Sequence, residues 1–312
     1  MTLPATGNRQ LATAFAPGSI GNVGPGFDVL GLAVDGIGDR VTVELTDGES
    51  RVASVTGRDA DLVPLDATRN AAAIAALAYL RPYGRRAIVS IEKGLPLAGG
   101  MGGSAASSVG GAYAAALAIG DDIDTNKIIA AALEGESAVA GRHLDNIAPC
   151  VLGGLALVRS VDPIDVVALP VRAAWWVALV TPRVRIQTKE ARALLPQECD
   201  RATWIQQMAN TTALAHAFAI GDGDLLRRAL DDKYAEPRRA ALIPRFYDVK
   251  RAALDAGSLG SSISGSGPTI FAIAADETAA RACADAMQHA FADIESSAHV
   301  GPIAKQGVRR ET

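Results

Sequence analysis

The sequence is poor in cysteine, with only Cys150, Cys199 and Cys283 among its 312 residues. These three lie far apart and form no CxxC pair, so neither a disulfide framework nor a zinc site is expected. Uncharged apolar stretches long enough to span a bilayer are also missing, and the opening residues lack the apolar core of a secretory signal. We therefore expect a cytoplasmic protein without a membrane partner, and a loose tail over residues 1–10.

Clustered positive charge is missing as well. The chain has 30 Lys and Arg against 34 Asp and Glu, a net charge of −4, and its arginines are spread along the sequence. This distribution argues against a nucleic-acid partner. At 49% hydrophobic and 21% charged residues, the chain has the composition of a globular protein that buries a substantial core.

Strand and helix patterns are mixed without a strict alternation. The segment 161–172 contains two prolines and a change of pattern, which marks a domain boundary. We expect an α+β fold in two domains, 1–165 and 166–312. The strand patterns cover 12–17, 41–45, 51–57, 87–93, 155–160, 174–182, 261–274 (broken by a Ser/Gly turn) and about 299–308; the helix patterns cover 70–82, 104–119, 125–140, 189–195, 203–219, 223–231, 245–256 and 277–291; residues 141–154 read as a loop.

A glycine-rich stretch precedes the second helix pattern, with four glycines between residues 99 and 103. It could be a flexible connector. It also fits the dinucleotide pattern G-x-G-x-x-A, but the chain then runs from helix to helix and lacks the second strand which that fold requires. The third interpretation is a phosphate cradle, because backbone N–H groups at a helix N-terminus bind anions and glycine lets them approach closely. There is no G-K-S/T, so the Walker motif is excluded.

The stretch PLAGGMGGSAA resembles the ATP loop of the GHMP kinases, usually P-x-x-x-G-L-G-S-S-A-A. Met101 replaces the usual Leu and Gly103 the first Ser, whereas Ser104 keeps the second. The resemblance implies that Ser104 helps to position Mg²⁺. The ATP-binding residues it implies are Pro96, Leu97, Ala98, Gly99, Gly100, Met101, Gly102, Gly103, Ser104, Ala105 and Ala106.

Five further segments are similar to homoserine kinases within that superfamily, in order along nearly the whole chain. They are residues 16–34, 143–154, 188–192, 236–244 and 264–272. The resemblance implies transfer of the ATP γ-phosphoryl group to the hydroxyl of L-homoserine, with ATP and Mg²⁺ as the cofactors. It also implies the two-domain GHMP kinase fold, with an N-terminal ribosomal-protein-S5-like α/β domain and a C-terminal ferredoxin-like α+β domain.

The same resemblance implies a set of substrate-binding residues. Asp28 suits the ammonium group, and Arg192 and Arg239 suit the carboxylate because a guanidinium binds it through two parallel hydrogen bonds. Structural alternatives stay open: Asn22 as a turn residue, and Asp28 or Thr188 as a helix cap. The full implied set is Asn22, Asp28, His143, Thr188, Arg192, Arg239 and Gly265.

Two residues carry open alternatives of their own. Asn70 is implied to lie near the adenine, but it opens a helix pattern and could only cap it. Asp145 matches the position of the base in mevalonate kinase. Equally, the role of Asp145 could be to fix its loop, with the phosphate itself receiving the proton of the substrate hydroxyl.

Two glutamates, Glu134 and Glu136, compete for the role of magnesium ligand. Two residues apart on a helix they point roughly 200° apart, so at most one can face the glycines. Glu136 projects onto the middle of the apolar stripe, and a carboxylate there needs a partner such as Mg²⁺. We predict Glu136 as the ligand unless the helix frays at Gly135. The stripe consists of Ile128, Ile129, Ala132, Leu133 and Val139.

Two other functions remain as alternatives. One is a GHMP kinase for another small alcohol, although the lysine expected near the first motif of a mevalonate-type enzyme is missing. The other is a non-catalytic ligand sensor on the same fold. The sequence leaves a monomer or a homodimer open, and it predicts that Trp204 and His216 pack into the core.

Overall fold

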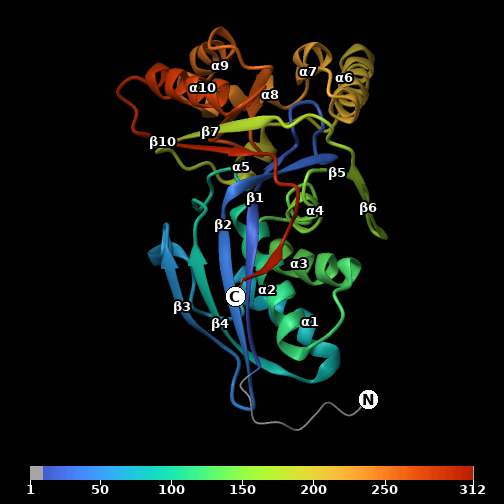
Figure 1. The fold of residues 1–312 in the computed structure, drawn as a ribbon, viewed down its shortest axis with the longest axis vertical. Helices are drawn as coiled ribbons and strands as arrows, with labels where there is room; N and C mark the ends of the chain where they lie inside the picture. The colour runs from blue at the N-terminus through green and yellow to red at the C-terminus, as the bar shows by residue number, and fades with distance from the viewer. Residues whose placement is uncertain (1–9, 312) are drawn as a thin grey trace.

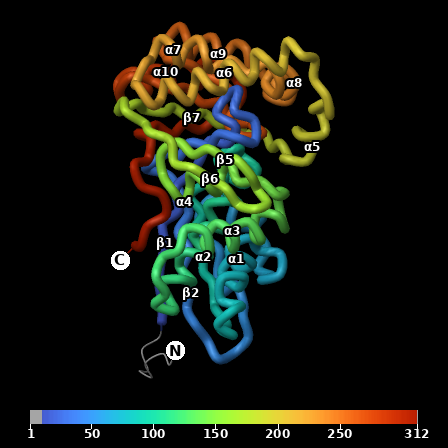
Figure 2. Tube along the Cα trace, turned by 90° about the vertical axis from the view of Figure 1, so that its right-hand side faces the viewer, coloured from blue at the N-terminus to red at the C-terminus, as the bar shows by residue number. Residues whose placement is uncertain are grey.

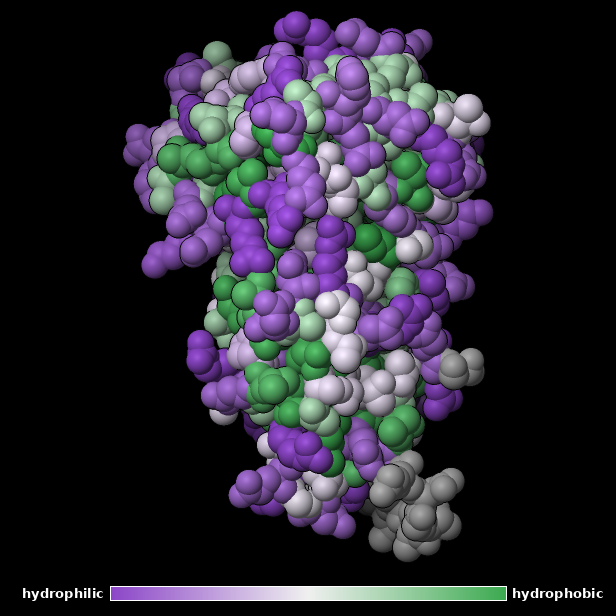
Figure 3. Space-filling model, turned by 90° about the vertical axis from the view of Figure 1, so that its left-hand side faces the viewer, coloured by the Kyte–Doolittle hydropathy of each residue, from purple (hydrophilic) through white to green (hydrophobic). Residues whose placement is uncertain are grey.

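Two β-sheets organise the protein. In the computed structural model, which describes residues 10–311, a seven-stranded sheet and a four-stranded sheet follow one another along the long axis (Figure 1). Of the tail expected over residues 1–10, all but Gln10 lies outside the described residues. Figure 3 shows hydrophilic side chains across the middle of one face, at the level where the two parts meet. No helix among residues 10–311 is long and apolar enough to cross a membrane.

The larger sheet is built around one long strand, β2. On one side β2 pairs with β1 along nearly its whole length, and on the other its first residues pair with β5 and its later part pairs with β4. The strand order is β11-β1-β2-β4-β3, with β5 on β2 and β6 on β5. The strands are β1 (Leu11–Gly21), β2 (Leu30–Thr46), β3 (Arg51–Gly57), β4 (Arg86–Lys93), β5 (Leu155–Val161), β6 (Ile164–Leu169) and β11 (Arg309–Glu311).

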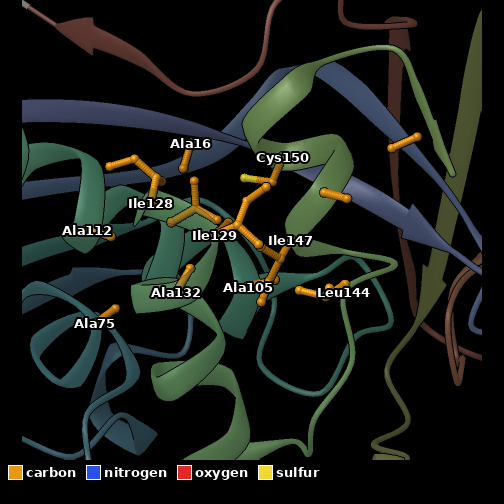
Figure 4. Close-up of a cluster of buried hydrophobic side chains, with 14 of the residues drawn as sticks. Ala16, Ala75, Ala105, Ala112, Ile128, Ile129, Ala132, Leu144, Ile147 and Cys150 are labelled. Carbon is orange, nitrogen blue, oxygen red and sulfur yellow. The ribbon is translucent and has the colours of Figure 1, made fainter. Parts of the chain in front are cut away.

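Helices α1, α2 and α4 pack against this sheet and α3 packs on these helices, and small side chains let them approach closely. A Cβ on Gly111 would lie 2.2 Å from the carbonyl oxygen of Ala72, so α2 and α1 touch backbone to backbone. Figure 4 shows Ile128 and Ile129 pointing into the core towards Cys150. Each buried Ile stabilises the fold by roughly 1.5–3 kcal/mol. The helices are α1 (Ala71–Leu80), α2 (Gly103–Ile119), α3 (Thr125–Val139) and α4 (Ile147–Leu152).

The smaller sheet has the order β10-β7-β9-β8 and is covered by helices on its outer face (Figure 2). The core beneath these helices includes Phe246 and Phe291, whereas Phe271 of this sheet belongs to the core of the larger sheet. The elements are β7 (Trp176–Pro182), β8 (Gly260–Ile263), β9 (Ile270–Ala274), β10 (Ser296–Pro302), α5 (Thr188–Ala193), α6 (Arg201–Ile220), α7 (Gly223–Ala229), α8 (Glu236–Arg239), α9 (Phe246–Asp255) and α10 (Glu277–Ala290); short 3₁₀ turns span Ala60–Leu62, Arg81–Tyr83 and Ala240–Leu242.

Most predicted elements are confirmed, but β2 begins at Leu30 rather than at residue 41 and α8 was not predicted. Three further differences concern the loops, the final strand and the domain boundary. The loop predicted over 141–154 contains α4, because Ile147 and Cys150 bury their side chains against neighbouring helices. The single final strand is two: β10 belongs to the small sheet and β11 returns to pair with β1. The boundary predicted after residue 165 falls inside β6, which pairs with β5, so the change of sheet comes after β6. The division into two folding domains stays a prediction.

Two predictions about side-chain burial are wrong. Trp204 is 54% exposed and His216 is exposed as well. Both lie off the buried face of α6, which consists of Asn210, Leu214, Ala217 and Phe218. Val139, placed on the apolar stripe of α3, is exposed because it is the last residue of that helix.

Candidate active site

The glycine loop, residues 94–103, connects β4 to α2 and cannot be built from larger residues. Gly100 and Gly102 have φ of 78° and 66°. A Cβ on Gly102 would lie 2.2 Å from the hydroxyl oxygen of Ser19, and one on Gly100 would lie 2.5 Å from the carbonyl oxygen of Ser264. No side chain caps α2, so its first N–H groups remain available to an anion. The loop therefore has the geometry of a phosphate cradle.

One cavity brings together most of the predicted site residues. It lies between the glycine loop, the end of α3, the turn after β1 and the arginines of α5 and α8. Its lining includes Pro96, Leu97, Ala98, Gly99, Gly100, Gly102, Gly103, Ser104, Glu136, Asn22, Asp28, His143, Asp145, Thr188, Arg192, Arg239 and Gly265. Lys93, Ala140, Asn146 and Ser266 also line it, and the sequence did not predict them.

Four predicted ATP-binding residues do not line the cavity. Met101, Ala105 and Ala106 are buried in the core beneath the loop, where they support its conformation by packing. Asn70 is also buried, and both ends of its amide are used locally. Its Oδ1 accepts from the Ala73 N–H at 3.2 Å and its Nδ2 donates to the Pro64 carbonyl at 2.9 Å. The structure thus gives Asn70 the role of helix cap, and an adenine contact has no support in this geometry.

Glu136, not Glu134, faces the cavity. The helix α3 continues to Val139 without fraying, and it leaves Glu136 only 6% exposed. Glu134 lies on the opposite side, where its carboxylate pairs with Arg81 at 2.8 Å on the surface. Burial raises the pKa of Glu136 to about 7, against the opposing effects of the Ser104 hydroxyl and the Lys93 charge. One of its carboxylate oxygens, Oε2, has no hydrogen-bond partner among the described residues.

The turn between β1 and β2 holds Asp28 in an unusual backbone conformation. Asn22, Val23 and Asp28 all have positive φ although none is glycine. Such strain persists where surrounding contacts impose it, and it is concentrated at functional sites. Here the amide of Asn22 supplies the contacts: its Oδ1 accepts from the Asp28 N–H at 2.9 Å, and its Nδ2 donates to the Gly265 carbonyl at 2.8 Å. Asn22 therefore shapes the loop, as the structural alternative proposed.

Asp28 faces Arg192 across the cavity. Nη1 and Nη2 of Arg192 donate to the two carboxylate oxygens of Asp28 at 2.9 and 2.7 Å. Nδ1 of His143 lies 3.4 Å from Nη2 of Arg192, and burial lowers the pKa of His143. The hydroxyl of Thr188 lies 3.5 Å from that of Ser266. Asp28 accepts from no helix N-terminus among residues 10–311, so it caps none of the helices described there.

Arg239 is the second cation of this region and is almost fully buried, at 2% exposure. Its Nη1 donates to the Gly265 carbonyl at 3.0 Å and its Nε to the Ala191 carbonyl at 3.3 Å. No carboxylate between residues 10 and 311 pairs with it, and burial lowers its pKa. The guanidinium carbons of Arg239 and Arg192 each lie 5.2 Å from the centre of the Phe27 ring. Arg239 is therefore a buried cation suited to a carboxylate ligand.

Asp145 lines the same cavity, on the loop before α4. It is buried, and its Oδ2 accepts from the backbone N–H of Asn22 at 3.1 Å. Burial raises its pKa to about 7, with the charge of Asp28 acting in the same direction. The loop that carries Asp145 can pack this closely against β2 because residue 31 is glycine: a Cβ there would lie 1.8 Å from the Asp145 carbonyl oxygen. A carboxylate with this pKa can both accept and release a proton near neutral pH.

Sequence reasoning missed three contributors to the site. Phe27 carries no signal beyond its place beside Asp28. Asn146 accepts from the Ser19 hydroxyl at 3.0 Å, between the glycine loop and the turn after β1. Lys93, the last residue of β4, is buried under the glycine loop together with Asp39.

Comparison with known proteins agrees with this geometry. Residues 70–154 match the family model of the GHMP kinases N terminal domain, and residues 214–293 match GHMP kinases C terminal. The chain is 40% identical to homoserine kinase of Chloroherpeton thalassium over 95% of its length and 98% of the relative. It is also 40% identical to that of Xanthomonas campestris pv. campestris over 98% and 96%.

The same relationship appears in three dimensions. The crystal structure of homoserine kinase from Cytophaga hutchinsonii superposes with a TM-score of 0.92 at 41% identity, covering 99% of this chain and 100% of the other. Fold, site geometry and near full-length similarity agree. The chain belongs to the homoserine kinase family of the GHMP kinases.

Proposed function

We propose that the protein transfers the γ-phosphoryl group of ATP to the hydroxyl of L-homoserine, giving ADP and O-phospho-L-homoserine. The observation that carries this proposal is the arrangement of Asp28, Arg192 and Arg239 at one end of a cavity whose other end is the glycine loop. A small zwitterion that carries a hydroxyl satisfies both ends. Its ammonium group binds the carboxylate of Asp28 and its own carboxylate binds the two arginines. Its hydroxyl points to the phosphates of ATP.

The binding of homoserine follows from the charges. Its carboxylate binds Arg239, which has no carboxylate partner among residues 10–311. It also binds Arg192, which then leaves its present partner Asp28. Its ammonium group takes the place of the Arg192 guanidinium beside Asp28. The zwitterion thus places an opposite charge beside each member of the Asp28–Arg192 pair. The free-energy cost of separating the pair is therefore small. His143 and Thr188 border the same end of the cavity and limit the orientation of the side chain.

The binding of ATP uses the backbone rather than side chains. The N–H groups at the start of α2 donate hydrogen bonds to the phosphate oxygens, and the helix dipole favours the negative charge of the phosphates. Catalysis of phosphoryl transfer consists largely of positioning and charge neutralisation. The glycine loop therefore holds the γ-phosphoryl group against the substrate hydroxyl.

The donor set at the start of α2 fits a magnesium ion. Oε2 of Glu136 is buried without a hydrogen-bond partner among the described residues, and the Ser104 hydroxyl is beside it. Carboxylate and hydroxyl oxygens are the ligands that Mg²⁺ takes, together with substrate phosphates. We assign Glu136 and Ser104 as the protein ligands. Bound there, the ion neutralises charge on the phosphates.

The proton of the hydroxyl needs an acceptor, and Asp145 is the residue that the cavity offers. Its pKa near 7 suits this task, since an acceptor works best when its pKa lies near the working pH. The backbone N–H of Asn22 holds one of its oxygens, which orients the carboxylate. A cytoplasmic location is part of the proposal, while the choice between monomer and homodimer remains open.

A coupled ADP-release assay tests the function. Homoserine, serine, mevalonate and galactose are compared at equal ATP and Mg²⁺, and the phosphorylated product is identified by mass spectrometry. We expect the highest kcat/KM with L-homoserine. A higher value with mevalonate or galactose would assign the chain to another alcohol, and binding of homoserine without product would make it a sensor.

A further inference from the structure

A buried ion pair lies directly beneath the glycine loop. It joins Lys93, the last residue of β4, to Asp39 of β2, and their side chains are 3% and 0% exposed. The Lys93 ammonium group donates to the Asp39 carboxylate, to the Ser107 hydroxyl at 2.9 Å and to the Gly103 carbonyl at 3.0 Å. An ammonium group has three donors, so all of them are used.

The carboxylate of Asp39 is used as completely. Its Oδ1 accepts from the backbone N–H groups of Gly94 at 3.1 Å and Leu95 at 3.2 Å. Its Oδ2 accepts from Lys93 and, at 2.7 Å, from the Ser107 hydroxyl. Asp39 thus holds the glycine loop where the loop leaves β4, and Lys93 holds it where α2 begins. One ion pair ties both ends of the loop together.

Stability alone does not account for this pair. Removing two charges from water costs free energy that their attraction repays only in part, and apolar replacements of similar volume are often as stable. The position of the pair points to the site instead. Lys93 lines the same cavity as Gly103 and Ser104, and its positive charge lowers the pKa of Glu136 against the effect of burial.

We propose that Lys93 and Asp39 are positioning residues for the nucleotide. They fix the two ends of the glycine loop and thereby hold the first N–H groups of α2 where the phosphates of ATP bind. This inference rests on the proposed ATP-dependent function. Neither residue takes part in the transfer step itself.

The test compares single and paired substitutions. Lys93→Met leaves a buried carboxylate unpaired and is expected to lower the melting temperature. Combining Lys93→Met with Asp39→Asn removes both charges, so this double variant is expected to melt near the wild type. Calorimetry with ADP is expected to show at least about tenfold weaker binding by the double variant. This is the effect expected when one or two charge-assisted contacts that hold the loop are lost. KM for ATP is expected to rise while KM for homoserine stays within about twofold.

An exposed pair of the same chemistry is the control. Lys233 and Asp231 lie 2.7 Å apart on the surface, and Lys233→Met with Asp231→Asn should leave ADP binding unchanged. If the double variant of Lys93 and Asp39 folds and binds ADP with wild-type affinity, the pair serves only packing and the proposal is overturned.

A milder variant keeps the proposal testable if the double variant does not fold. Ser107→Ala removes only the hydroxyl shared by the pair, and we expect it to weaken ADP binding several-fold; unchanged binding would contradict the proposal. The wild type separates this test from the proposed function. If it binds ADP but prefers another alcohol, the positioning role still holds, whereas a wild type that binds no ADP removes the proposed function itself.

Discussion

Asp28 and Arg192 form an ion pair with two parallel hydrogen bonds, at 2.9 and 2.7 Å, across the cavity that the substrate enters. Each partner is complementary to one charge of an amino acid. A zwitterion can separate the pair and compensate both residues at once. A ligand with a single charge leaves one partner in a half-buried site without its counter-ion, which is costly. The pair therefore selects for molecules that carry both charges close together.

Arg239→Ala should raise KM for homoserine by roughly tenfold to hundredfold, the effect of losing a charge-assisted contact worth about 1.5–3 kcal/mol. Arg192→Ala should act in the same direction but less strongly, because its side chain is 37% exposed and already paired. Steady-state kinetics should show little change in KM for ATP.

Arg238→Ala is the matched control. This neighbour donates to the Tyr234 carbonyl and stacks on the Tyr234 ring, outside the cavity. Its homoserine kinetics should remain those of the wild type. Normal homoserine kinetics in both the Arg192 and Arg239 variants would reject the assignment of the carboxylate site.

Phe27→Leu should also raise KM for homoserine, by about threefold to tenfold. The ring of Phe27 lies against both guanidinium groups at 5.2 Å, and a cation–π contact is worth about 0.5–2 kcal/mol. Phe27→Tyr keeps the aromatic face and should restore a KM near that of the wild type. If Leu and Tyr behave alike, the ring does not position the arginines.

Glu136→Gln should lower kcat strongly, by about a hundredfold, and raise the Mg²⁺ concentration needed for half-maximal rate. The amide cannot supply the anionic ligand that the buried carboxylate offers. Glu134→Gln, with its side chain at the surface, should leave both quantities nearly unchanged. A magnesium titration of the two variants measures this directly. Loss of activity in the Glu134 variant with a normal Glu136 variant would reverse the assignment.

Stability without Mg²⁺ or nucleotide should depend on pH through Asp145. Its pKa is near the ordinary 3.8 in the unfolded chain and about 7 in the folded protein, so the folded state holds this proton more tightly. Stability due to this group is therefore present below about pH 4 and is lost as the pH rises towards 7.

Asp145→Asn removes this loss. The variant should gain melting temperature relative to the wild type between about pH 5 and about pH 8. Glu134→Gln should follow the wild-type curve. Parallel melting curves for the Asp145 variant and the wild type would show that Asp145 keeps an ordinary pKa.

Local patterns predicted much of this structure. The 3.6-residue period of α3 identified Glu136 as the glutamate on the inner face, and the glycines identified the phosphate cradle. The Asp28–Arg192 pair joins residues 164 positions apart, and only the tertiary packing of the chain brings them together. Asn70 is a different case: the capping pattern is confirmed by the structure, and the adenine contact that similarity suggested stays a prediction.

Lys93 and Asp39 were missed for a related reason. Their ion pair links two strands across 54 positions, and no sequence pattern distinguishes it from surface charges. What distinguishes this ion pair from surface pairs is its burial, and burial follows from the tertiary fold. The resemblance to homoserine kinases thus predicted most of the residues that face the cavity, but not which of them pair with each other.

The most direct test of the account compares three alcohols as phosphate acceptors under identical ATP and Mg²⁺. L-homoserine carries both charges, 4-hydroxybutanoate lacks the ammonium group, and 3-aminopropan-1-ol lacks the carboxylate. We predict that kcat/KM falls by at least about a hundredfold for each of the two singly charged alcohols, since each leaves part of the Asp28–Arg192–Arg239 set uncompensated. A kcat/KM for either of them within a few-fold of that for L-homoserine would contradict the account.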